Sequence, residues 1–67
     1  MLNELEKRKI FNDIVNTLQS EGYSPYEQLT GYLKSGDERY ITRKNNARGK
    51  IRLLDLMYIN EKLKSFL

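Results

Sequence analysis

The residues best suited to chemistry in this chain are cations gathered in one short stretch. Residues 39–52 contain six of the twelve Lys and Arg residues and no acid, while the rest of the chain holds all nine Asp and Glu residues. The stretch therefore carries +6 and the remainder −3, although the net charge is only +3. Such a division is typical of a protein that meets an anionic partner surface. The six cations are Arg39, Arg43, Lys44, Arg48, Lys50 and Arg52.

Four of these cations are the candidate partner-binding residues: Arg43, Lys44, Arg48 and Arg52. Arg48 and Arg52 are four residues apart, so on a helix that begins near residue 46 they would project from one face. A guanidinium group matches a carboxylate or a phosphate with two parallel hydrogen bonds. We therefore expect an arginine face that docks an acidic surface or a phosphate group on a partner protein.

Nucleic acid is the alternative partner. Residues 43–48 include Arg, Lys and Asn, which contact phosphates and base edges, and the sequence pI is about 9.3. The acidic remainder of the chain argues against this partner. Tyr40 and Tyr58 flank the basic stretch, but tyrosines at such positions more often pack in a core or at its rim than stack on bases. A small basic nucleic-acid-binding protein is thus the second hypothesis, and a structural subunit of a larger assembly is the third.

No residue set points to catalysis. The chain has no Cys and no His, which removes thiol chemistry and the strongest metal ligands. General acid–base work would need Asp, Glu, Lys or Tyr with shifted pKa values inside a cavity, and 67 residues leave little room for one. The adjacent acids Asp37 and Glu38 follow a glycine and are typical of solvated loop carboxylates. We expect no enzyme activity, no cofactor and no bound metal.

The elements that must position the basic stretch are helical. Apolar residues at three- and four-residue steps predict a first helix over residues 3–20, ended by Gly22. Ser24, Pro25 and Glu27 form a capping-box start for a second helix, which should stop at Gly36. The apolar stripe of the first helix is Leu5, Ile10, Phe11, Ile14, Val15 and Leu18, and that of the second is Leu29, Tyr32 and Leu33.

The second half of the chain is predicted as a connection followed by helix. Residues 39–45 form a connecting segment pinned to the core by Tyr40 and Ile41. The helical pattern then runs from residue 46 to the end, either as one helix or as two if Asp55 caps a second piece. The stripe of this region comprises Ile51, Leu54, Tyr58, Ile59, Leu63 and Phe66 or Leu67.

The expected fold is therefore all-α: three to four short helices in a compact bundle, with residues 1–67 as a single domain. A chain of this size without disulfides or metal usually needs a partner subunit. Leu53, Leu56 and Met57 fall off the apolar stripe, which favours an intermolecular interface and a homodimer. No apolar run approaches the roughly 20 residues that span a bilayer, residues 1–11 are too charged for a secretory signal, and the lack of Cys fits a reducing compartment. We expect a cytoplasmic protein with no membrane partner.

Several stretches of the chain resemble the IreB/ReoM family of Firmicutes regulators. The similar stretches are Glu21-Gly22-Tyr23-Ser24-Pro25, Gln28-Leu29-Thr30-Gly31-Tyr32-Leu33-Lys34-Ser35-Gly36-Asp37, Tyr40-Ile41 and Asn46-Ala47-Arg48. Residues 10–67 can be laid on the family pattern, and Arg43, Arg48 and Arg52 coincide with its arginines. Leu56-Met57-Tyr58 replaces a charged Arg-Asp-Glu step of the family.

The resemblance implies a helical homodimer without enzymatic activity that acts downstream of a membrane Ser/Thr kinase with PASTA repeats. It also implies control of cell-wall synthesis, through contacts that steer Clp-dependent proteolysis of the enzyme committing precursors to peptidoglycan. The expected partners are a second copy of the chain and partner proteins such as the Clp machinery or an adaptor. Family members carry the kinase-target threonine in an N-terminal arm, whereas the threonines here are Thr17, Thr30 and Thr42.

Overall fold

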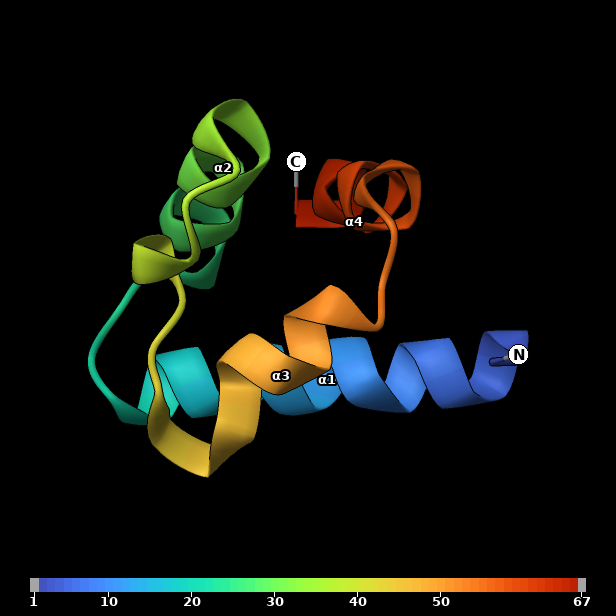
Figure 1. The fold of residues 1–67 in the computed structure, drawn as a ribbon, viewed down its shortest axis with the longest axis horizontal. Coiled ribbons are helices and arrows are strands. Elements are labelled where there is room, and N and C mark those ends of the chain that lie inside the picture. The colour runs from blue at the N-terminus through green and yellow to red at the C-terminus, as the bar shows by residue number, and fades with distance from the viewer. Residues whose placement is uncertain (1, 67) are drawn as a thin grey trace.

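The computed structural model describes residues 2–66 and confirms the all-α prediction, with four α-helices and no strand in that range. The helices are α1 (Glu4–Ser20), α2 (Pro25–Ser35), α3 (Ala47–Arg52) and α4 (Leu56–Leu63). Short 3-10 turns cover Glu38–Tyr40, Lys44–Asn46 and Lys64–Phe66. Helices α1 and α3 lie against each other as one layer, and α2 and α4 form the other layer (Figure 1).

Helix α1 begins at a capping box that satisfies two backbone groups. The Asn3 side chain accepts from the Glu6 backbone N–H at 2.8 Å, and the Glu6 carboxylate accepts from the Asn3 N–H at 3.0 Å. The helix ends before Gly22, whose φ of 84° is the left-handed conformation expected of a residue past a helix C-terminus. The Tyr23 N–H then donates to the Leu18 carbonyl at 3.0 Å. The predicted end of the first helix is confirmed.

Helix α2 starts and stops where the sequence predicts. Ser24 accepts from the Glu27 backbone N–H at 3.4 Å, which is one half of the predicted capping box, and Pro25 occupies the first turn. At the other end Gly36 has a φ of 70° and its N–H donates to the Tyr32 carbonyl at 2.7 Å. This left-handed cap turns the chain toward the connecting segment.

Two helices, not one, follow the connecting segment. Helix α3 stops at Arg52, and Asp55 caps α4 by accepting from the Tyr58 backbone N–H at 2.7 Å. Of the two arrangements left open by the sequence, the Asp55-capped one is correct. The break lets α3 cover α1 while α4 crosses to α2, as Figure 1 shows.

One buried cluster joins all four helices and the connecting segment. The predicted stripes supply most of it, and the connecting segment contributes Ile41, which is fully buried. The prediction for Leu5 is wrong: its side chain is 55% exposed, because the first turns of α1 extend past α3 (Figure 1). The side chain of Phe66 and all of Leu67 lie outside the described residues. The cluster comprises Phe11, Ile14, Leu18, Leu29, Ile41, Ala47, Ile51, Leu54, Ile59 and Leu63.

Tyr58 sits at the edge of this core, between α1 and α4. Its ring meets Phe11 edge-on at 6.4 Å between centroids, and the ammonium groups of Lys7 and Lys62 lie 5.6 and 5.4 Å from its centroid. Burial, and secondarily the nearby Glu4 carboxylate, raises the pKa of the Tyr58 phenol. Tyr58 is therefore a packing residue, as the sequence interpretation expected.

Three large apolar side chains stay exposed at the junction of α3 and α4. Leu53, Leu56 and Met57 are 57%, 51% and 74% exposed. Their exposure agrees with their predicted position off the buried stripe. None of the described helices is long and apolar enough to cross a membrane.

Gly31 lets the connecting segment approach α2 closely. A Cβ built on Gly31 would lie 2.4 Å from Cε1 of Tyr40, a distance that real atoms do not adopt. The Tyr40 ring therefore rests directly on the α2 backbone. Tyr40 is 41% exposed, so this ring packs at the rim of the molecule rather than in its core.

The Gly31–Tyr40 contact predicts a non-additive pair of substitutions. In a Tyr40→Ala background, Gly31→Ala should stabilise the fold by about 0.5–1 kcal/mol, since alanine restricts the unfolded chain and favours helix. With the ring present, that gain should be lost because the ring must move away from the new methyl group. Urea unfolding of the four proteins in this cycle measures the coupling. Equal effects of Gly31→Ala in both backgrounds would refute the contact.

Candidate functional site

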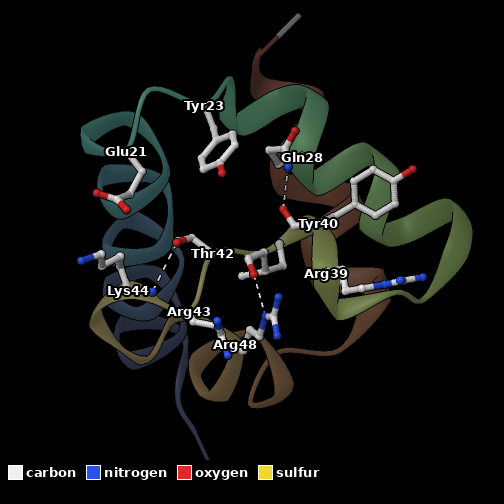
Figure 2. Close-up of a pocket in the computed structure, with 10 residues that line it drawn as sticks. Glu21, Tyr23, Gln28, Arg39, Tyr40, Thr42, Arg43, Lys44 and Arg48 are labelled. Atoms are coloured by element: carbon white, nitrogen blue, oxygen red, sulfur yellow. Dashed lines mark hydrogen bonds between the residues drawn. The ribbon is translucent and has the colours of Figure 1, made fainter.

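The basic stretch, residues 39–52, covers most of the connection between α2 and α3 and the whole of α3. A pocket of about 440 Å³ opens beside it, where the end of α1, the start of α2 and the connection meet (Figure 2). Three of the four predicted residues, Arg43, Lys44 and Arg48, line this pocket, and Arg52 does not. The full lining is Glu21, Tyr23, Gln28, Arg39, Tyr40, Ile41, Thr42, Arg43, Lys44 and Arg48.

Two side chains hold the pocket wall by binding successive carbonyls of the connection. Gln28 of α2 donates through Nε2 to the Tyr40 carbonyl, and Arg48 of α3 donates through Nε to the Ile41 carbonyl, both at 2.8 Å. Ile41 lies between them with its side chain fully buried. The wall is therefore fixed before any ligand arrives, which lowers the entropy cost of binding.

The turn after Thr42 sets the position of Arg43 and Lys44. The Thr42 hydroxyl accepts from the Lys44 backbone N–H at 3.2 Å. Asn45 and Asn46 both have a φ of 53°, in the left-handed region that Asn tolerates better than most residues. The Asn45 amide also reaches α1, where it donates to the Thr17 hydroxyl at 3.2 Å and to the Asp13 carboxylate. The two cations thus stand on a turn that is tied to α1.

Arg52 is engaged elsewhere. Its Nε and a terminal amino group donate to the two Glu38 carboxylate oxygens at 2.5 and 2.6 Å. This bidentate pair, foremost through its hydrogen bonds, lowers the pKa of Glu38 and raises that of Arg52. The charge of Arg48 also contributes to lowering the pKa of Glu38.

Two further cations are also matched with acids. Arg39 forms a hydrogen-bonded ion pair with Asp37, with a closest distance of 2.8 Å, and this pair lowers the pKa of Asp37. Lys50 pairs with Asp13 of α1. Asp37 and Glu38 are therefore counter-ions of the basic stretch. The sequence interpretation, which described them as solvated loop carboxylates, is wrong on this point. The long-range pairing of Glu38 with Arg52 and the local pairing of Asp37 with Arg39 both arise from the fold of the connection.

Tyr23 and Gln28 are two of the pocket residues that the sequence interpretation missed. Figure 2 shows the Tyr23 ring pointing into the pocket from the side opposite Arg43 and Arg48. Neither residue is near the basic stretch in sequence, so charge patterning had no means of including them. The family resemblance was the available signal, because both residues lie in the similar stretches.

The pocket has the chemistry of an anion site. Four cations and one carboxylate, that of Glu21, line it together with the Thr42 hydroxyl and the Tyr23 phenol. Its volume lies in the range of small-molecule and side-chain binding pockets, roughly 300–1,000 Å³. Among residues 2–66 no group of three or more Asp and Glu side chains is arranged to hold a metal ion.

The Glu38–Arg52 pair predicts a pH-dependent contribution to stability. The folded-state pKa of Glu38 lies below its ordinary value near 4.5, so the pair stabilises the fold above that pH and the stabilisation is lost as the carboxylate protonates at lower pH. Glu38→Gln should therefore lower the urea midpoint near pH 7 and have a progressively smaller effect toward about pH 3. In an Arg52→Gln background, Glu38→Gln should have little effect at either pH. A pH-independent difference would contradict the pairing.

A comparison with models of protein families identifies the family of this chain. The model of the IreB regulatory phosphoprotein family matches residues 2–67, which is nearly the whole chain. The match covers both the helices that frame the pocket and the connection that carries Arg43, Lys44 and Arg48. This chain therefore belongs to the IreB family of regulatory phosphoproteins.

Proposed function

We propose that this chain is a non-enzymatic adaptor that docks partner proteins through the arginine pocket, formed around Arg43, Lys44 and Arg48. The observation that carries the proposal is that these three cations line one preformed pocket while no carboxylate of residues 2–66 forms an ion pair with them. A regulatory role is the known character of the family. Arg52, beside Glu38, would contribute at the margin of the same surface.

The family resemblance supports a more specific setting for this activity. We propose that the protein acts in the cytoplasm, in control of peptidoglycan synthesis and Clp-dependent proteolysis downstream of a Ser/Thr kinase. In this setting the docked partner is a component of the Clp machinery, an adaptor or the enzyme to be degraded. The pocket offers one discrete binding point for an acidic or phosphorylated group on such a partner.

Nucleic acid is less well supported as the partner. Binding along a nucleic-acid backbone uses a continuous basic track, whereas Arg39, Lys50 and Arg52 are neutralised by Asp37, Asp13 and Glu38. The remaining cations of residues 39–52, Arg43, Lys44 and Arg48, all line one pocket. The next phosphates of an extended polyanion would therefore meet ion pairs with no net charge, which offer them little attraction.

The docking proposal predicts that partner capture depends on the arginines. Affinity capture from a lysate of a bacterium that carries a family member, followed by mass spectrometry, should recover discrete partners with the wild type. The variant Arg43→Ala/Arg48→Ala/Arg52→Ala should lose them, because its anion contacts are gone. The matched control Arg8→Ala/Lys9→Ala/Lys64→Ala removes the same charge from exposed positions elsewhere and should retain them. Circular dichroism checks that each variant is folded. If both variants recovered the partner proteins equally well, the proposal would be wrong.

We further propose that the adaptor is a homodimer that buries the junction of α3 and α4. The exposed side chains of Leu53, Leu56 and Met57 support this, since contiguous apolar surface on a small protein commonly marks an interface. The family resemblance implies the same state. A dimer would also supply the burial that a chain of this size lacks.

The dimer proposal predicts a mass of about twice 8.0 kDa in light scattering. Met57→Glu should shift the protein toward the monomer, because a carboxylate would be buried without a partner. Asn12→Glu adds the same charge at an exposed position of α1 and should leave the dimer intact. A wild-type protein that runs as a monomer at every concentration tested would overturn the proposal.

A further inference from the structure

The charge left over in the arginine pocket identifies the kind of anion that it suits. This inference rests on the proposed docking function and concerns the same site. Of the pocket cations, Arg39 is already paired with Asp37. Arg43, Lys44 and Arg48 remain, opposed within the lining by the single carboxylate of Glu21. The pocket therefore has an excess of two positive charges.

The geometry directs part of this charge inward. Arg48 uses its Nε to bind the Ile41 carbonyl, which fixes the guanidinium plane and leaves both terminal amino groups for a ligand. Arg43 is exposed on the turn beside it. The Thr42 hydroxyl and the Tyr23 phenol add neutral donors, and Figure 2 shows the Tyr23 ring on the opposite side of the pocket from Arg43 and Arg48.

We propose that the pocket binds the phosphorylated side chain of a serine or threonine in a partner protein. A phosphate monoester carries about −1.5 to −2 charges near pH 7 and presents three acceptor oxygens, whereas a carboxylate carries one charge. The phosphate thus matches the pocket's excess charge, and a single Asp or Glu would neutralise only half of it. Paired guanidinium donors are also the usual recognition device for phosphorylated residues.

The surroundings of the pocket favour one compact dianion over a longer one. Glu21 lies in the lining, and Asp37 and Glu38 are close enough for the Arg48 charge to lower the pKa of each carboxyl. Because Asp37, Glu38 and Asp13 are paired with Arg39, Arg52 and Lys50, a chain of successive phosphates would meet no further unpaired cation of residues 39–52 on leaving the pocket. A single phosphorylated side chain, in contrast, places all of its negative charge within the pocket.

The test is a titration of the isotope-labelled full chain with a short peptide that carries phosphoserine between neutral residues. Amide signals of residues 21–23 and 39–48 should shift in the NMR spectrum as the peptide binds. The same peptide with Glu in place of phosphoserine should bind about tenfold more weakly, and the one with unmodified Ser should not bind measurably. Inorganic phosphate alone and vesicles that contain a phosphoinositide should each bind more weakly than the phosphopeptide.

Two matched variants locate the binding. Arg43→Gln removes an exposed pocket cation and should weaken phosphopeptide binding by about tenfold. Arg8→Gln removes the same charge from an exposed position of α1 outside the pocket lining and should change the affinity by less than about twofold. Backbone spectra of both variants show whether the fold is retained.

Several outcomes would overturn the inference. Equal binding of the Glu peptide would show a general carboxylate site. Tighter binding of inorganic phosphate, of the phosphoinositide vesicles or of a single-stranded oligonucleotide titrated in the same way would assign the pocket to that ligand. Equal loss of affinity with Arg43→Gln and Arg8→Gln would show that the binding does not depend on the pocket. If no phosphopeptide binds while arginine-dependent partner capture persists, this inference fails and the proposed docking function stands; if neither depends on the arginines, both fail.

Discussion

The burial of Ile41 holds the connection between α2 and α3 in place, and the pocket depends on that connection. The Ile41 side chain lies in the core with no exposed surface, and the carbonyls of Tyr40 and Ile41 receive hydrogen bonds from Gln28 and Arg48. One apolar side chain and two polar anchors therefore fix a segment that has little regular structure of its own. Arg48 serves both as an anchor of this segment and as a pocket cation. The anion site is therefore assembled when the segment folds.

The fold also decides which cations of the basic stretch remain available. Lys50 turns toward Asp13 of α1, and Arg52 toward Glu38 before α3. Arg39 is taken up locally by Asp37. What remains is a compact patch on one turn and one helical residue. Of the six cations in residues 39–52, the fold thus leaves three unpaired ones close together in one small site. This arrangement favours recognition of a single anionic group over attraction to any polyanion.

The helices were largely predictable because their signals are local. Apolar spacing located α1 and α2, the left-handed glycines Gly22 and Gly36 ended them, and Asp55 marked the possible break before α4. Leu5 was misplaced because spacing alone does not reveal where a neighbouring helix stops covering its partner.

The candidate site was predictable only in part. Arg43, Lys44 and Arg48 follow from charge patterning, but the pairing of Arg52 with Glu38 joins residues fourteen apart and depends on how the connection folds back. Tyr23 and Gln28 come from other elements and carry no charge signal. Such tertiary pairings are set by the packing of the whole chain, so a local sequence pattern does not reveal them.

Asn45 has a consequence for which sequences this fold can accept. Its backbone occupies the left-handed region, and its side-chain amide donates to Thr17 and Asp13 on α1. Glycine would adopt the backbone without the amide, aspartate would set a second carboxylate against Asp13, and serine or lysine would strain the turn. Glycine, aspartate, and serine or lysine would thus each lose a different feature of the Asn45 turn. We therefore expect fewer substitutions to be tolerated at this uncharged position than at the exposed Arg43 nearby.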